Sequence, residues 1–195
     1  MAGTPGADRV TRPALLALCA LGVLALLATL APANPVSMLG WQREAPWAPL
    51  PLIGAHFAHL GPAHLAINLA ALAVLGWAAQ RVRSFGDFLL ALLCAAMTVD
   101  AGLILQVWPV EWYVGLSGVL HGGFAWLCLR LTRARGGVLP WLLWIGGLAK
   151  ALAEMQVPAG SLGPMGFPLA LAAHLYGYLG GSAWAVTERL LRRAA

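Results

Sequence analysis

Two residues far apart in this 195-residue sequence have the side chains that acyl transfer requires. Ser117 lies in the run Gly115-Leu116-Ser117-Gly118, and His174 follows Ala173 near the C-terminus. A serine hydroxyl becomes a nucleophile when a base within hydrogen-bond distance accepts its proton, and histidine is the usual base. If the fold brings Ser117 and His174 together, the pair predicts acyl transfer through a covalent intermediate.

Other groups suit the negative charge that develops on the carbonyl oxygen during such a reaction. The Gly-flanked run around Ser117 predicts a turn into a helix, where backbone N–H groups have no intrahelical partner. Asn68 and His64 can add side-chain donors. These groups are the candidates for an oxyanion hole.

The elements that must position these residues are predicted to cross a membrane. The chain is 61% hydrophobic and 10% charged, whereas a soluble domain has about 25% charged residues. Six stretches are long and apolar enough to span a bilayer at about 20 residues each. They cover residues 14–33, 62–80, 88–107, 115–131, 138–157 and 168–187. We expect an all-α membrane protein with one domain over 14–187 and short tails at 1–13 and 188–195.

The basic residues predict the orientation of the six spans. Ten of the 12 Lys and Arg residues flank the spans on the side of both termini, and Arg43 lies on the opposite side. This bias predicts cytoplasmic termini. Because the basic residues are not gathered on one face, the net charge of +5 does not favour nucleic-acid binding.

The first span has an alternative interpretation. Basic residues, an apolar run and Ala31-Pro32-Ala33 also resemble a cleavable signal peptide. The apolar run is longer than the usual 7–15 residues of such signals. We therefore expect a retained span.

The predicted topology places the reactive side chains in one layer near the outer face. At 1.5 Å per residue, Asn68 and His174 lie ~9 Å below the outer surface. Ser117 lies about three residues deep, and His64 is one turn above Asn68. Polar residues are costly inside a membrane, so a shared depth indicates a functional site.

Small residues predict that the helices carrying the serine and the histidine pack closely. One stripe is formed by Ala173, Gly177 and Gly181, and Gly118 and Gly122 form another. Small residues at four-residue spacing let helix backbones approach each other in lipid.

Several other polar residues offer competing roles. His121 is four residues after Ser117 and shares its helix face, but it lies one turn deeper, where protonation is harder. We expect His174 to be the base and His121 to pack or form a hydrogen bond. The spacing of His56, His59 and His64 matches no strong zinc motif and no cysteine joins them, so no metal or other cofactor is predicted.

Within this set, His59 is expected to brace its loop, and His56 stays unassigned. Lys150 and Glu154 are four residues apart and are expected to neutralise each other. Asp100 has no partner that the sequence identifies.

The three patterns together resemble those of rhomboid intramembrane proteases. Gly115 to Gly118 resembles the GxSG motif, His64 to Asn68 the HxxxN motif, and Ala173-His174 with Gly177 and Gly181 the AHxxGxxxG motif. The resemblance implies a six-helix rhomboid bundle with Ser117 as nucleophile and His174 as base, a dyad without an acidic third member. It also implies an oxyanion hole of Asn68, His64 and the Ser117 N–H, and no metal or cofactor.

Such enzymes cut transmembrane segments of other proteins near the outer face, and their fifth helix gates substrate access beside the second. The usual Trp-Arg pair of the first loop is not reproduced at Trp47-Ala48-Pro49, and His121 replaces an aromatic residue that commonly packs on the base. Residues 117–122 and the short chain look more like the rhombosortase branch. That branch implies a bacterial inner-membrane enzyme that faces the periplasm and processes C-terminal Gly-Gly sorting tags.

Two other classes remain open at this stage. A non-catalytic rhomboid-like protein would bind transmembrane segments without cutting them, and it would be expected to lack the serine or the histidine. A transporter would need polar residues along a path across the membrane, and here they gather in the outer half, Asp100 excepted.

Overall fold

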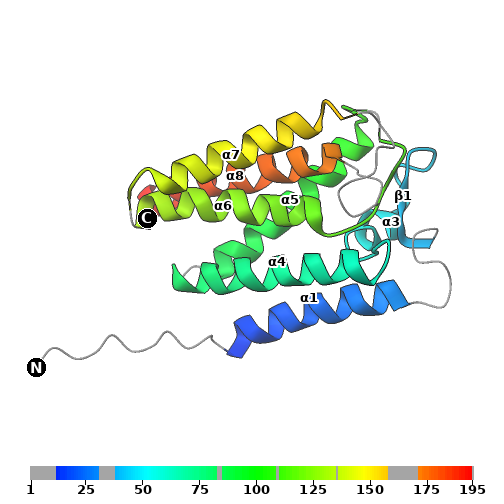
Figure 1. The fold of residues 1–195 in the computed structure, drawn as a ribbon, viewed down its shortest axis with the longest axis horizontal. Coiled ribbons are helices and arrows are strands. Elements are labelled where there is room, and N and C mark those ends of the chain that lie inside the picture. The colour runs from blue at the N-terminus through cyan, green and yellow to red at the C-terminus, as the bar shows by residue number, and fades with distance from the viewer. Residues whose placement is uncertain are drawn as a thin grey trace, which may run out of the picture.

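The structure is a computed structural model that describes residues 12–30, 38–82, 85–108, 110–134, 136–157 and 171–194. It is mostly helical, as predicted (Figure 1). The long helices are α1 (Arg12–Leu30), α4 (Pro62–Arg81), α5 (Phe85–Ile104), α6 (Ser117–Ala134), α7 (Leu139–Glu154) and α8 (Leu171–Ala194). A short helix, α3 (Pro49–Gly54), lies at one end of the bundle.

Helix α8 is the centre of the packing. It packs against α6 and α5 along much of its length and also contacts α7. Helix α4 contacts α6 and α5, and α1 lies along α4 at the edge of the bundle (Figure 1). The serine and histidine identified in the sequence therefore belong to the most closely associated helix pair.

Each of the six predicted stretches overlaps one long helix. Within the described residues, α4 and α5 are long and apolar enough to cross a membrane, and α1 has a shorter apolar stretch over Leu16–Leu30. Helix α7 has only 16 residues, and the last turns of α6 and α8 carry arginines. Length and composition therefore support a membrane crossing for α4 and α5, and we propose it for the other four long helices.

Two sequence predictions concern the ends of the chain. Residues 1–11 and the signal-like Ala31-Pro32-Ala33 lie outside the described residues. Helix α8 continues through residues 188–194, the segment expected to be the basic tail. In this extension Glu188 is buried and accepts hydrogen bonds from Trp126 at 2.9 Å and from Arg192 at 3.0 Å.

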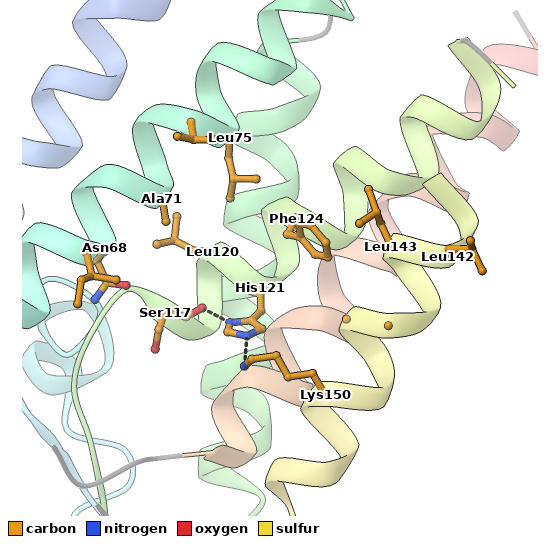
Figure 2. A pocket seen from close by; sticks show the side chains of 14 residues that line it. Asn68, Ala71, Leu75, Ser117, Leu120, His121, Phe124, Leu142, Leu143 and Lys150 are labelled. Atoms are coloured by element: carbon orange, nitrogen blue, oxygen red, sulfur yellow. Dashed lines mark hydrogen bonds between the residues drawn. The ribbon is translucent and has the colours of Figure 1, made fainter. Parts of the chain in front are cut away.

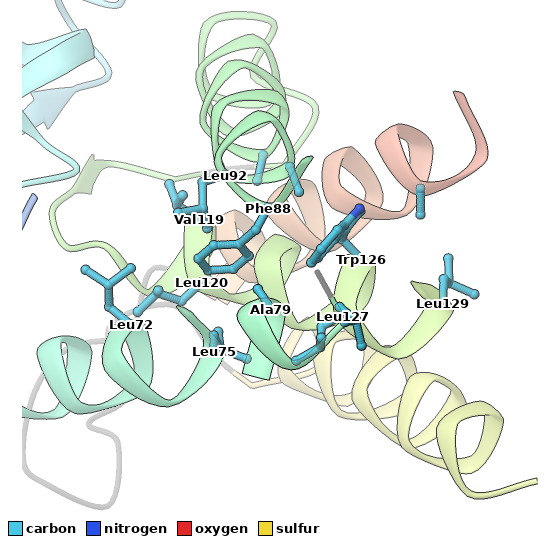
Figure 3. Packing of buried hydrophobic residues seen from close by; sticks show 14 of the residues in the cluster. Leu72, Leu75, Ala79, Phe88, Leu92, Val119, Leu120, Trp126, Leu127 and Leu129 are labelled. Atoms are coloured by element: carbon cyan, nitrogen blue, oxygen red, sulfur yellow. The ribbon is translucent and has the colours of Figure 1, made fainter. Parts of the chain in front are cut away.

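The main core lies where α4, α5, α6 and α8 meet. Phe88 of α5 and Trp126 of α6 are fully buried, and their rings pack 5.9 Å apart with planes tilted by 47° (Figure 3). Leu75 and Ala79 of α4 complete this cluster from the other side. Many other large apolar side chains face outward, as expected for helices that contact lipid. Exposed examples on α7 are Leu139, Leu142, Leu143, Ile145 and Leu152.

A small cap covers the end of the bundle near α3. Strand β1 (Trp41–Gln42) pairs antiparallel with β2 (Trp112–Tyr113), with Trp41 opposite Tyr113. On its exposed side Arg43 donates a hydrogen bond to Glu111 at 2.9 Å. Strand β2 leads directly into α6, so the cap determines the path of the chain into Ser117.

Candidate active site

The structure brings Ser117 and His174 into hydrogen-bond contact. Ser117 is the first residue of α6, and His174 lies in the first turn of α8. The Ser117 hydroxyl is 2.9 Å from His174 Nε2, and the His174 ring is buried. This is the contact that a nucleophile and its base require.

The small residues allow this contact because α6 and α8 touch through their backbones. A Cβ added at Gly118 would lie 2.8 Å from the carbonyl oxygen of Ala173. One added at Gly177 would collide with the carbonyl oxygen of Gly118, and one at Gly181 with that of Gly122. Larger residues at these positions would force the two helices apart.

The second histidine near Ser117 has other partners. The His121 ring stacks on His174 at 4.1 Å with planes 15° apart. Its Nδ1–H donates to the Ser117 carbonyl at 2.7 Å, and its Nε2 accepts from the Lys150 ammonium at 3.2 Å (Figure 2). Both ring nitrogens are therefore engaged, and neither contacts the serine hydroxyl in this arrangement.

A carboxylate completes the surroundings of His174. Glu154, the last residue of α7, accepts from His174 Nδ1–H at 2.8 Å through Oε2 and from Lys150 through Oε1. The expected Lys150–Glu154 pair is present, but Glu154 also binds the histidine. The motifs in the sequence imply a dyad without an acidic third member, so they do not predict this contact.

Asn68 and His64 lie beside the start of α6. Asn68 is buried, lines the same pocket as Ser117, and donates to the His64 carbonyl at 3.2 Å. The His64 ring lies against Gly115, where an added Cβ would be 2.7 Å from Cε1. Gly115 has a φ of +111°, so glycine suits both the backbone and the close approach of the ring.

A second set of polar residues supports the turn into α6. The Tyr113 hydroxyl donates to the Gly115 carbonyl at 2.5 Å, and the Gly115 N–H donates to Ala55 at 2.7 Å. His56 bonds to Tyr113 at 3.2 Å and to Asp100 at 3.1 Å. Both residues that the sequence left without a role or partner thus belong to this network. Burial and the nearby Asp100 carboxylate raise the pKa of Tyr113, so its hydroxyl keeps its proton.

His59 is held in the loop before α4. It is buried, and its Nδ1–H donates to the Phe57 carbonyl at 2.8 Å. Burial lowers the pKa of His59 to about 4, so the ring is neutral at physiological pH. This contact fits the expected bracing role.

An apolar pocket opens beside Ser117. It has a volume of about 600 Å³ and lies between α4, α6 and α7 (Figure 2). Its wall is mostly apolar, and Asn68, Ser117, His121 and Lys150 supply its polar groups. The pocket therefore offers an apolar chain segment a place next to the serine.

The structure groups a different set of possible metal ligands from the three histidines that the sequence suggested for zinc. Among the described residues, ligand atoms of His121, Glu154 and His174 lie within 4.8 Å of one another. The Lys150 ammonium already bonds to two of these three residues. A divalent cation would have to displace this positive charge, so the arrangement does not favour a metal ion.

Comparison with known families identifies the chain. The model of the Rhomboid domain matches residues 46–190, about three quarters of the sequence. The chain belongs to the rhomboid family. No curated protein matches the sequence. The rhomboid domain includes all the residues of the three motifs, and together with the apolar helices it indicates an integral membrane protein.

Proposed function

We propose that this rhomboid protein is an intramembrane serine endopeptidase with Ser117 as nucleophile and His174 as general base. The observation that carries the proposal is the 2.9 Å contact between the Ser117 hydroxyl and His174 Nε2, next to an apolar pocket. Membership of the rhomboid family supports the same reaction class and transmembrane substrates.

The proposed reaction uses His174 Nε2 first as a base and then as an acid. His174 Nε2 accepts the hydroxyl proton as Ser117 Oγ attacks the peptide carbonyl carbon. The Ser117 N–H, Asn68 and His64 are proposed to stabilise the resulting oxyanion. The C–N bond then breaks, the leaving amine takes the proton from His174, and a water molecule hydrolyses the acyl-enzyme.

The substrate is proposed to reach Ser117 through the pocket between α4 and α7. A transmembrane segment brings an apolar surface, which matches the wall of this pocket. We propose six membrane spans with both termini cytoplasmic, because basic residues concentrate on that side. The site then faces the periplasm of a bacterial inner membrane.

For the substrate class we propose C-terminal Gly-Gly sorting tags of secreted or surface proteins. The proposal rests on the resemblance of residues 117–122 to rhombosortases. Glycine also weakens a helix by about 1 kcal/mol relative to alanine, which helps a segment unwind before the serine attacks. The test compares the C-termini of membrane-anchored secreted proteins from cells with and without this protein. Shortened C-termini ending near Gly-Gly only when it is present would support the class, and identical C-termini would refute it.

The activity itself is tested in liposomes with a reporter transmembrane segment as substrate. We expect cleavage by the wild type and none by Ser117→Ala or His174→Ala. Glu111→Gln serves as control, since Glu111 is exposed on the cap and pairs with Arg43. Binding of the segment without cleavage by the wild type would favour the non-catalytic class instead.

A further inference from the structure

Glu154 contacts His174 in a way that the sequence motifs do not predict. His174 lies between two oxygens, with the Ser117 hydroxyl on Nε2 at 2.9 Å and a Glu154 oxygen on Nδ1 at 2.8 Å. A carboxylate accepts only, so Nδ1 carries the ring proton and Nε2 is free to accept the serine proton. This is the tautomer that a general base needs.

We infer that Glu154 is a positioning residue for the proposed protease, which holds His174 in the base-competent tautomer and stabilises the imidazolium formed when Ser117 attacks. The site would then work as a Ser-His-Glu triad instead of a dyad. The inference rests on the proposed function, because it concerns the same reaction. Acidic groups act in this way in other serine hydrolases, where they orient the ring and stay ionised.

Neighbouring contacts keep the Glu154 carboxylate in place and ionised. Its second oxygen accepts from the Lys150 ammonium, which lies one helical turn earlier on α7. The helix itself is anchored on α8, because Trp144 donates to Ser182 at 3.2 Å and the Tyr178 hydroxyl donates to the Trp144 carbonyl. A charged group inside a membrane is costly, so a carboxylate that is paired and held in place here indicates a functional role.

The other titratable groups around His174 do not duplicate this contact. His121 of α6 stacks on the ring and is bonded to Lys150, and His64 of α4 is near enough to interact electrostatically. Helix α5 packs on α8 and carries Asp100, whose carboxylate binds His56. Among the described residues, Glu154 is the carboxylate in contact with His174.

The inference is tested by the rate at which a fluorophosphonate labels Ser117 between pH 5 and 9 in the wild type, Glu154→Gln, Glu154→Asp and Glu111→Gln. An amide can donate to Nδ1 and so favour the wrong tautomer, and it cannot stabilise the imidazolium. We expect Glu154→Gln to label about 10- to 100-fold more slowly, the usual effect of losing a charged hydrogen bond. Its acidic limb should move to lower pH by about one unit, because protonated His174 loses its anionic partner.

Glu154→Asp keeps the charge on a side chain one methylene shorter, so its rate and acidic limb should lie between those of the wild type and Glu154→Gln. It also decides the test if Glu154→Gln is not recovered folded. Glu111→Gln should match the wild type. Wild-type rates and an unmoved limb in both Glu154 variants would overturn the inference, as would slower labelling with the limb unmoved, which indicates a purely structural role. A wild type that does not label at all would refute the proposed function itself.

Discussion

Replacing Gly177 by alanine tests whether close helix packing creates the site. The new Cβ would collide with the carbonyl oxygen of Gly118, which is backbone and cannot rotate away. Non-bonded heavy atoms need more than about 3 Å, so α6 and α8 must separate by roughly 1 Å. The contact between Ser117 and His174, now 2.9 Å, would then exceed hydrogen-bond distance.

We expect Gly177→Ala to label with a fluorophosphonate about 100-fold more slowly, since a misplacement of about 1 Å costs this much. Overpacking should also destabilise the fold by about 1–3 kcal/mol, measured by thermal unfolding in detergent. The matched control is Gly86→Ala in α5, where the added carbon has no neighbour within 4 Å. Wild-type labelling and stability in Gly177→Ala would refute the packing argument.

Three further predictions concern residues around the site. His121→Phe should keep measurable labelling of Ser117, because a stacked ring is retained and the base is untouched; a loss as complete as in His174→Ala would reassign the base. Tyr113→Phe leaves the Gly115 carbonyl without its donor and should lower stability by about 1–3 kcal/mol in thermal unfolding, and an unchanged melting temperature would contradict this. The folded protein holds His59 neutral down to a pKa of about 4, whereas the unfolded chain gains this proton below about pH 6.5. Stability should therefore fall by up to roughly 3 kcal/mol between pH 6.5 and 4. A His59→Leu variant should lose this part of the pH dependence, and an identical slope in both proteins would contradict it.

The mostly helical fold and the pairing of helices followed from local patterns in the sequence. Apolar stretches of bilayer length and small residues at four-residue spacing have direct physical consequences, and the glycines of α6 and α8 meet as that spacing predicts. The meeting of Ser117 and His174 was predictable because the predicted topology places both in one layer near the outer face.

The role of Glu154 was not predictable in the same way. The sequence offers Lys150, four residues earlier, as a partner for Glu154. This ion pair neutralises both charges without a residue from another helix. Contact with His174 depends on the rotation of α7 relative to α8, which no local pattern determines. The predicted topology places Glu154 in the same layer as Ser117, but a shared depth does not predict which way a side chain points.

The network of His56, Tyr113 and Asp100 was missed for a related reason. Its members come from the cap, strand β2 and α5, and their meeting depends on how an irregular outer segment folds over the bundle. Short polar contacts of this kind have no periodicity that a sequence pattern can reveal.

Whether Ser117 attacks with the help of His174 is tested most directly by locating the fluorophosphonate adduct with peptide mass spectrometry. We predict a single modified residue, Ser117, in the wild type, and almost no adduct in His174→Ala under the same conditions. An adduct on another residue, or equal modification of Ser117 in His174→Ala, would contradict the account.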